Sequence, residues 1–377
     1  MPRRSWSACV LLALAAFAGC DSNAGNVAGA GKKPGAPSAS PGSSSGGDLR
    51  RIILLTNGNS PFWDTGAAGL QAAEKDLGLK QAGLAAVVEV NDGTPQGQID
   101  KLRQFGGQAD VAAIGVSVID AANAAIADEM RKLQAQGIQV VTIDSDVERE
   151  AFRDARFAFI GTDNLVAGRD LGTALAHLLP GGGEYVTFVG RTGAQNAIER
   201  VDGVAEGAGG KFASLDNMGD DIDRDRAQEN VRNAIINHPK LKALVGIWSY
   251  NAPAIVHVVK ELDRRKDFKI AVFDAEPVAI KDMEDGNVDV MVVQNPFQMG
   301  YQGVRLMKAL IEKDDATIKE MLPNGGDAEG DLVDTGLKVV VPDGATPLAA
   351  GQFGAKTEFL KLSEFKEWLA KYGLEGS

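Results

Sequence analysis

Short apolar runs alternate with stretches of helical periodicity along most of the chain, beginning at Leu49. The apolar runs are four to six residues long and rich in Val, Ile and Phe, which predicts buried β-strands. We expect strands at residues 52–56, 86–90, 111–115, 139–143, 157–160, 185–189, 243–247, 270–273 and 288–293. We expect helices between them at residues 62–77, 97–104, 121–136, 165–179, 227–237 and 297–311.

Strands that alternate with helices indicate right-handed crossovers and parallel sheets with helices on both faces. The number of predicted strands is large for a single sheet, so we expect them to be divided between two sheets. A chain of 377 residues also fits two domains, at roughly 150 residues each. The pattern therefore predicts an α/β protein with two doubly wound lobes.

Polar or aromatic residues follow the ends of the predicted strands. In sheets of this kind, ligands bind beyond the carboxyl ends of the strands, so these positions are candidates for a site. They are Asn57, Asn59, Asp144, Arg191, Trp248, Asp274 and Gln294.

The chemistry of these side chains suits a ligand rich in hydroxyl groups. Carboxylates accept hydrogen bonds from hydroxyls, amides donate and accept, and a guanidinium offers a planar fork of donors. Asn59, Asp144, Arg200, Asp274 and Gln294 together provide that set. Flat aromatic side chains match the apolar faces of a sugar ring, and Phe62, Trp63, Trp248 and Tyr250 offer them near the same strand ends.

Each of these residues also has a purely structural interpretation. Asn59 and Ser60 precede Pro61 and could simply cap a helix. Asp144 and Asp274 could cap loops, and Trp248 could belong to the core. Arg200 could pair with Glu199 or Asp202 on a solvated helix. The coincidence of all of them at predicted strand ends favours a binding site.

Composition narrows the class of partner. The formal net charge is −12 and no Lys/Arg block occurs, which argues against nucleic acid. The two cysteines, Cys9 and Cys20, leave the folded part without a disulfide or a thiolate metal site. The three histidines, His177, His238 and His257, show no metal-ligand spacing. No GxGxxG follows a predicted strand and no GxxxxGK[ST] occurs, so we expect no cofactor, no metal and no catalytic residue.

The first twenty residues have the layout of an export signal. Arg3 and Arg4 precede an apolar run at 8–18, which is too short to span a bilayer, where about twenty residues are needed. The segment 17–20, FAGC, resembles a bacterial lipobox with Phe in place of the usual Leu, which implies acylation of Cys20. The alternative is that Cys20 is incidental and the protein is released in soluble form.

Residues 21–48 consist mostly of Gly, Ser, Ala, Pro, Asn and Lys. Such a composition buries too little apolar surface to offset the entropy of ordering, so we expect a flexible linker. The predicted signal and linker place the protein in the periplasm or cell envelope, lipid-anchored to the membrane through Cys20.

Over residues 51–341 the chain resembles the ribose-binding-protein group of type I periplasmic binding proteins. The segment IILLTNGNSPFWDTGAAGL is similar to the family's first strand, aromatic turn and helix, which implies that Phe62 and Trp63 sandwich a sugar. GIQVVTIDSD is similar to the strand ending in a ligand-binding Asp, here Asp144. The segments NAIERVDG, IAVFDAEP and VVQNPFQMG place Arg200, Asp274 and Gln294 at ligand-binding positions of the family.

Three segments depart from the family pattern or leave a choice. Ser145 stands where the ribose binder has Arg, which removes a donor, and Asp146 is a candidate to contribute instead. LVGIWSYNAPAIV leaves Tyr250 or Asn251 as the strand-end ligand residue. In NMGDDIDRDRAQENV, either Asp223 or Asp225 lies near the cleft, or both belong to a capped acidic helix start.

The resemblance implies lobe 1 at residues 49–160 plus 295–335 and lobe 2 at 161–294 plus 336–377, with three hinge crossings near Ile160, Gln294 and Thr335. It implies a monomeric binding protein that closes on a sugar or polyol and hands it to the permease of an ABC importer. A receptor of the same fold that signals to a membrane sensor is the main alternative. A repressor is disfavoured because no DNA-binding helix pair precedes the first strand, and a nucleotide-cofactor enzyme lacks its motifs. Residues 357–372 are predicted to form an amphipathic helix on one lobe.

Overall fold

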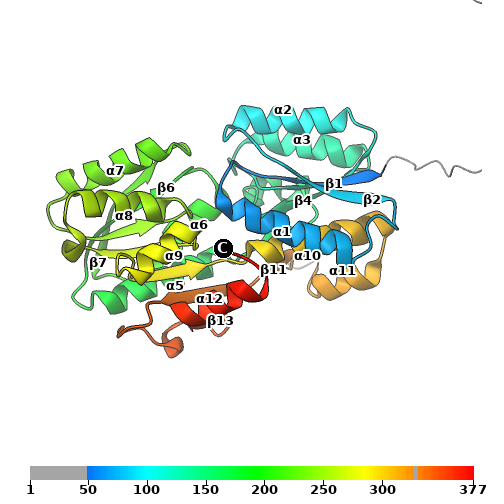
Figure 1. Ribbon diagram of the computed structural model, residues 1–377. Helices are drawn as coiled ribbons and strands as arrows, with labels where there is room; N and C mark the ends of the chain where they lie inside the picture. Colours follow the sequence, from blue (N-terminus) through cyan, green and yellow to red (C-terminus); the bar gives the residue numbers. More distant parts are fainter. Residues whose placement is uncertain (1–48, 326–329) are drawn as a thin grey trace, which may run out of the picture. The chain divides into compact units, whose positions relative to one another are not determined.

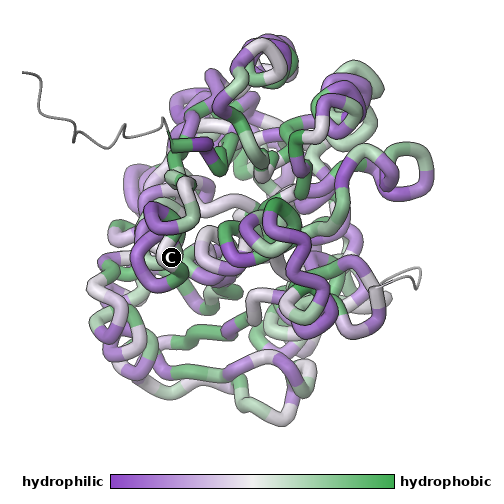
Figure 2. The backbone as a smooth tube through the Cα atoms, turned by 90° about the vertical axis from the view of Figure 1, so that its right-hand side faces the viewer, coloured by the Kyte–Doolittle hydropathy of each residue, from purple (hydrophilic) through white to green (hydrophobic). Residues whose placement is uncertain are grey.

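The computed structural model describes residues 49–325 and 330–377. The compact unit that begins at Gly47 contains two sheets with helices on both faces of each, as the alternating pattern predicts (Figure 1). Hydrophobic and hydrophilic residues are interspersed along the helices (Figure 2), as expected for helices that pack one face on a sheet. No helix in the described ranges is both long and apolar enough to cross a membrane.

The first lobe is built on a six-stranded parallel sheet. Its strand order is β11-β5-β4-β3-β1-β2. The strands are β1 (Arg50–Leu55), β2 (Leu84–Glu89), β3 (Val111–Val116), β4 (Gln139–Ile143), β5 (Phe159–Gly161) and β11 (Leu332–Asp334). The helical segments are α1 (Pro61–Asp76), α2 (Pro95–Gly106), α3 (Ala124–Ala135), α4 (Arg149–Phe152), the 3-10 turn η1 (Arg153–Ala155), α10 (Pro296–Glu312) and α11 (Asp315–Met321).

Alternate residues of β1 show how this sheet is buried on both faces. Ile52 and Leu54 pack in one apolar cluster with residues of α1 and α10. Ile53 and Leu55 pack in another with residues of α2 and α3. Because side chains of a strand point alternately to opposite faces, a continuous apolar run serves both clusters.

The second lobe contains a seven-stranded sheet with the order β13-β12-β10-β9-β8-β6-β7. Its strands are β6 (Gly183–Val189), β7 (Phe212–Gly219), β8 (Leu241–Gly246), β9 (Lys269–Phe273), β10 (Val290–Val293), β12 (Leu337–Val341) and β13 (Thr357–Lys361). Its helices are α5 (Asn164–Leu178), α6 (Gln195–Ala208), α7 (Arg224–Asn237), α8 (Asn251–Glu261), α9 (Pro277–Glu284) and α12 (Leu362–Lys371), with 3-10 turns η2 (Arg265–Asp267) and η3 (Ala350–Gln352). Only the β10–β12 pair among the described ladders is antiparallel.

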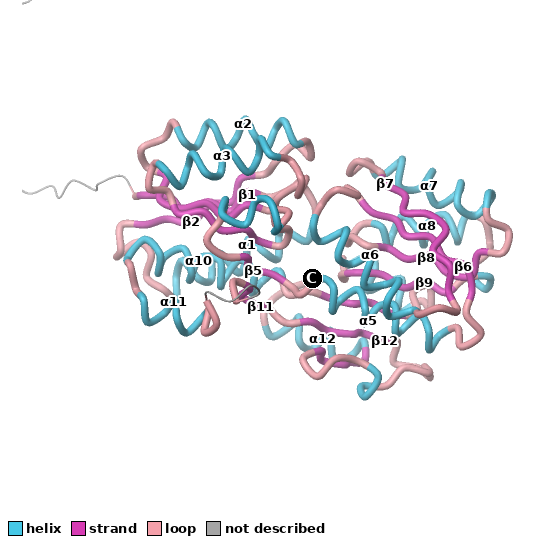
Figure 3. The backbone as a smooth tube through the Cα atoms, turned by 180° about the vertical axis from the view of Figure 1, so that it is seen from behind, coloured by secondary structure: helices cyan, strands magenta, loops and turns pink. Residues whose placement is uncertain are grey.

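Within the described residues, three segments carry the chain between the two sheets. They join β5 to α5, β10 to α10, and β11 to β12 (Figure 3). The crossings leave the carboxyl ends of β5, β10 and β11. The loops at the carboxyl ends of both sheets are where a ligand site is expected in this kind of fold.

The prediction for residues 357–372 is wrong in its first five residues. Thr357–Lys361 form the strand β13, which pairs in parallel with β12, and only Leu362–Lys371 are helical. Backbone groups at the edge of β12 pair with this segment, and β12 was itself absent from the predicted strands, as was β11. Strand β7 was also absent from the prediction, because it is an edge strand with an irregular alternation of exposed and half-buried residues.

Candidate functional site

A cavity lies between the carboxyl ends of strands from both lobes. Of the residues predicted to bind a ligand, Asn59, Phe62, Trp63, Asp144, Arg200, Trp248, Tyr250, Asp274 and Gln294 line it. Its remaining lining residues are Asn57, Gly58, Ser60, Asn196, Ile222 and Ser249. The structure therefore brings together side chains that are more than two hundred residues apart in the chain.

Two buried aspartates face the cavity from opposite lobes. Asp144 follows β4, and its Oδ2 accepts a hydrogen bond from Ser117 Oγ at 2.9 Å. Asp274 follows β9, and its Oδ1 accepts one from Gln294 Nε2 at 3.0 Å. Burial raises the pKa of Asp144 and raises that of Asp274 to about 6. Both carboxyl groups are thus desolvated acceptors at the strand ends.

Arg200 is a fully buried cation between these acceptors, with 1% of its surface exposed. Its Nε donates to Asn164 Oδ1 at 2.9 Å, and its Nη1 donates to the carbonyl oxygen of Ile247 at 3.0 Å. Nη1 also lies 4.0 Å from Asp274 Oδ2, and the guanidinium sits 4.4 Å above the Phe273 ring. Burial lowers the pKa of the guanidinium. The solvated-helix interpretation of Arg200 is therefore wrong.

Two polar atoms at the cavity have no hydrogen-bond partner among the described residues. They are Nη2 of Arg200, a donor, and Oε1 of Gln294, an acceptor. An unpaired buried polar group costs about 1–3 kcal/mol, so most such groups in folded proteins are paired. A hydroxyl group can accept from one of these atoms and donate to the other.

Aromatic side chains form much of the remaining wall. Phe62 and Trp63 meet edge to face, with ring centroids 5.1 Å apart. Trp63 Nε1 donates to Asn57 Oδ1 at 3.1 Å, which holds the indole in place. The cap position of α1 belongs to Ser60, whose side chain makes no capping hydrogen bond. The helix-cap interpretation therefore does not account for Asn59, which instead lines the cavity.

Trp248 is held by an amide of the second lobe. Its Nε1 donates to Asn196 Oδ1 at 3.2 Å, while the Nδ2 of Asn196 lies 3.4 Å from Asp144 Oδ2 in the first lobe. Asn196 escaped the prediction, although it lies four residues before Arg200 on α6 and therefore on the same helix face. That spacing was the signal that could have identified it.

Asn251 differs from the other predicted residues because it supports the wall and does not line it. Its Oδ1 accepts from the backbone N–H of Trp248 at 2.9 Å, and its Nδ2 donates to Asp220 Oδ2 at 3.0 Å. Tyr250 Oη donates to the other oxygen of Asp220. Burial raises the pKa of Asp220 to about 6. Asp220 was missed because it follows β7, the edge strand that the apolar pattern did not reveal.

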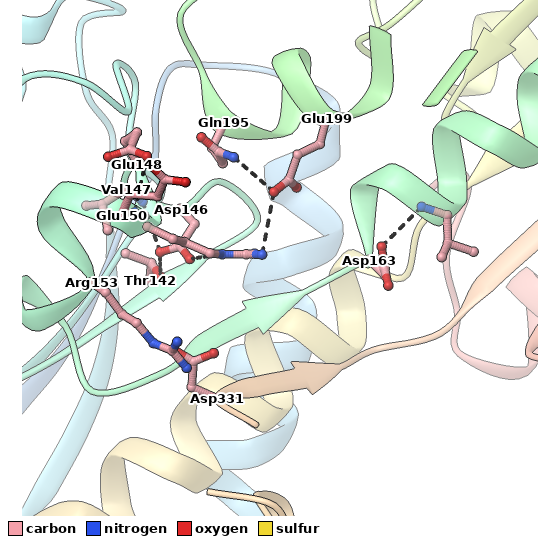
Figure 4. A network of polar contacts seen from close by, with 12 residues as sticks. Thr142, Asp146, Val147, Glu148, Glu150, Arg153, Asp163, Gln195, Glu199 and Asp331 are labelled. Carbon is pink, nitrogen blue, oxygen red and sulfur yellow. Dashed lines mark hydrogen bonds and ion pairs between the residues drawn. The ribbon is translucent and has the colours of Figure 1, made fainter. Parts of the chain in front are cut away.

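Asp146 does not take the role considered for it beside Ser145. Its carboxylate accepts from Thr142 Oγ1 at 2.6 Å (Figure 4). It also accepts from Arg156 Nη2 at 2.7 Å. Arg149 Nε also donates to it at 3.0 Å. Asp146 is therefore the centre of an ion-pair network, and its hydrogen-bonding capacity is directed away from the cavity.

The acidic segment before α7 is a capped helix start. Asp223 occupies the cap position and accepts from the backbone N–H groups of Asp225 and Arg226. Arg191, at the end of β6, donates to Asp221 Oδ1 at 2.8 Å and to the carbonyl oxygen of Gly93 at 2.6 Å. Arg191 therefore bridges the two lobes, and neither Arg191 nor Asp223 lines the cavity.

Other contacts also join the two lobes directly. Arg149 Nη1 lies 3.5 Å from Glu199 Oε1 on α6. The backbone N–H of Ala121 donates to the carbonyl oxygen of Gly193 at 2.9 Å. The described residues contain no group of three or more His, Cys, Asp or Glu side chains placed to hold a metal ion. Cys20 and the predicted signal and linker lie outside the described residues.

Residues 52–315 match the family model described as a periplasmic binding protein domain. The D-allose-binding periplasmic protein of Escherichia coli is 23% identical over 262 residues, covering 68% of this chain and 82% of the relative. The ribose import binding protein of Salmonella typhimurium is 24% identical over 191 residues, or 50% of this chain. The matched region spans only 62% of the length of that ribose-binding relative.

A solved structure has the same fold. It is an ABC transporter solute-binding protein from Burkholderia graminis in complex with D-arabinose. The two chains are 24% identical with a TM-score of 0.66, and the alignment covers 79% of this chain and 97% of the other.

Proposed function

This chain belongs to the periplasmic binding protein family, and we propose that it captures a sugar or sugar-like polyol between its two lobes. The observation that carries the proposal is the pair of unsatisfied atoms in the cavity, the Nη2 donor of Arg200 and the Oε1 acceptor of Gln294. Neighbouring hydroxyls of one ligand would pair both atoms at once. The sugars named for its relatives, D-allose, ribose and D-arabinose, all carry such hydroxyls.

The cavity wall supports this ligand class in three further respects. Asp144 and Asp274 are acceptors for hydroxyl protons, one from each lobe. Phe62, Trp63 and Trp248 offer flat apolar surfaces for the faces of a ring. Sugars and polyols are also uncharged, so binding one does not disturb the compensation between the charges of Arg200 and the two aspartates.

Capture proceeds by closure at the three crossings. The ligand touches residues of both lobes, so it binds the closed arrangement more tightly than an open one and shifts the equilibrium toward closure. Cross-lobe contacts such as Arg149 with Glu199 form only when the lobes approach. The permease of an ABC importer then takes the sugar from the closed protein.

The protein carries out this task in the periplasm or cell envelope, held to the membrane by a lipid on Cys20. The proposal assigns binding to this site and no reaction. We propose that residues 21–48 connect this anchor to the folded body.

A thermal-shift screen tests the binding step. The full chain carrying Cys20→Ser is mixed with D-ribose, D-allose, D-arabinose, hexoses, polyols and, as controls, amino acids and nucleosides. Selective binding raises the melting temperature by mass action, by an amount set by concentration over Kd. A shift with one sugar or polyol that Asp274→Asn abolishes supports the proposal, while no shift with any sugar or polyol contradicts it.

An uptake assay tests the delivery step. Cells that lack the protein should lose uptake of the sugar found in the screen and recover it with the unaltered chain. Normal uptake without the protein would reject delivery to a permease and favour a receptor of the same fold that signals to a membrane sensor.

A further inference from the structure

Residues 373–377 return from the end of α12 to the backbone of the candidate site. The N–H of Ser377 donates to the carbonyl oxygen of Ala275 at 3.0 Å, and the N–H of Ala275 donates to that of Ser377 at 2.7 Å. Ser377 Oγ donates to the carbonyl oxygen of Gln294 at 2.8 Å. Ala275 directly follows Asp274. This segment therefore contacts the backbone next to Asp274 and the backbone of Gln294, and both of these residues line the cavity.

The same segment also reaches the first lobe. Thr65 Oγ1, on α1, donates to the carbonyl oxygen of Gly376 at 3.0 Å, in a buried position. Gly376 lies so close to Ala275 that a Cβ placed on it would come within 2.6 Å of the Ala275 carbonyl oxygen. Residues 373–377 therefore fit between the lobes only because position 376 has no side chain. In Figure 1 this end of the chain lies between the two sheets.

A row of aromatic side chains crosses between the lobes beside this segment. On α10 of the first lobe, Phe297 stacks with Tyr301 and lies 5.2 Å from the ring of Tyr372. Tyr372 in turn lies 5.3 Å from Trp368 of α12, in the second lobe. Aromatic pairs at these separations are favourable by about 0.5–1.5 kcal/mol beyond the area that they bury. The row fixes the start of residues 373–377 against the first lobe.

The backbone that this segment contacts is strained. Asp274 has φ of 63°, in the left-handed region that non-glycine residues rarely adopt. Such a conformation persists when surrounding bonds determine it. Asp274 N–H donates to the Val292 carbonyl oxygen at 2.8 Å, and the next residue, Ala275, is fully buried and paired to Ser377 through both backbone groups. Loss of Ser377 leaves those two groups of Ala275 unpaired.

We propose that residues 373–377 are a positioning element of the ligand site: they hold Asp274 and Gln294 in place and, through Gly376, link that geometry to the approach of the lobes. The proposal rests on the sugar-binding function proposed above. These residues do not line the ligand cavity themselves, but Phe62 belongs both to its wall and to the hollow that they line.

Two variants of the full chain carrying Cys20→Ser test the proposal. Deletion of residues 373–377 removes all of these contacts, whereas Thr65→Val removes only the hydrogen bond between α1 and Gly376. Thr173→Val is the control, since Thr173 is a half-buried threonine of α5 that does not line the hollow of residues 373–377. Melting temperature verifies that each variant is folded.

Affinity is measured by calorimetry with D-ribose and D-allose, and lobe separation without sugar is measured by small-angle X-ray scattering. Thr65→Val should weaken sugar binding by about fivefold, the effect of one ordinary hydrogen bond. The deletion should weaken it more and increase the radius of gyration, and Thr173→Val should change neither. Affinities of both variants within twofold of the parent would overturn the proposal.

The scattering experiment separates failure of this inference from failure of the proposed function. If the parent chain binds no sugar, the proposed function fails. The radius of gyration without sugar then tests by itself whether residues 373–377 link the two lobes. A larger radius for the deletion variant than for Thr173→Val supports the link between the segment and the lobes. An equal radius of gyration in the two variants overturns the link. If the deletion variant does not fold, the radius of gyration of Thr65→Val is compared with that of Thr173→Val instead.

Discussion

Asp144 and Asp274 share the same left-handed backbone conformation, with φ of 66° and 63°, and each directly follows a buried strand of a different lobe. The backbone turn aims both carboxylates into the cavity that contains Arg200. Aspartate and asparagine tolerate this conformation better than other non-glycine residues. The two positions can therefore be tested with asparagine, which retains the turn and removes the charge.

Asp274→Asn should weaken sugar binding by about ten- to a hundredfold, the value of a hydrogen bond to a charged group. The ligand-free variant should melt no lower than the parent at pH 7, because burial of the ionised carboxyl disfavours the folded state there. Calorimetry and thermal unfolding measure the two effects. Asp128→Asn, on an exposed residue of α3, is the control. An unchanged affinity in Asp274→Asn would remove Asp274 from the site.

Arg200→Met should reduce the free energy of unfolding by about 3–5 kcal/mol at pH 7, because it leaves buried carboxylates without their compensating charge. The loss should be smaller at pH 5, where Asp274, with its pKa of about 6, takes up a proton. Urea unfolding at both pH values checks this. Arg169→Met, which breaks an exposed pair with Glu206, should cost less than about 1 kcal/mol. Equal losses in the two variants would contradict the role assigned to Arg200.

Asp220 should make the protein less stable as the pH rises toward neutrality. Its pKa of about 6 in the folded protein lies above the ordinary value of 3.8, so the folded state binds this proton more tightly than the unfolded chain. Its contribution to stability is fully present below pH ~4 and is lost as the pH rises through about 6. Asp220→Asn should flatten this part of the stability profile between pH 4 and 7. A variant profile parallel to that of the parent would show that Asp220 does not titrate in this range.

Glu199→Gln should weaken sugar binding by about two- to fivefold, because it removes the charge that faces Arg149 across the lobes. The side chain of Glu199 is 16% exposed, so added salt should reduce the difference only in part. Glu206→Gln provides a matched control on the same helix, since its ion pair with Arg169 lies within one lobe. Calorimetry at two salt concentrations measures the affinity of both variants. Equal affinities of Glu199→Gln and Glu206→Gln would show that the Arg149–Glu199 ion pair does not stabilise the closed form.

The local pattern of the chain was sufficient to predict the strands β1 to β6 and β8 to β10 and the residues that follow them, but it did not predict the buried strand β12. Residues 139–143 form β4 as predicted. Asp144 of the first lobe and Asp274 and Gln294 of the second line one cavity because the carboxyl ends of the strands of both sheets face it. Continuous apolar runs of this kind are recognisable without knowledge of their neighbours, since both faces of the strand are buried.

Features that depend on which elements and side chains come into contact were decided only by the tertiary structure. β13 is a strand because β12 offers it an unpaired edge, and β7 is exposed enough to hide its pattern. Asn251 binds Asp220 and so stands behind the wall, while Asp146 is drawn into pairs with Arg149 and Arg156. Hydrogen bonds and ion pairs have a range of a few ångströms, and which groups come within that range is determined by how the two lobes pack and approach each other.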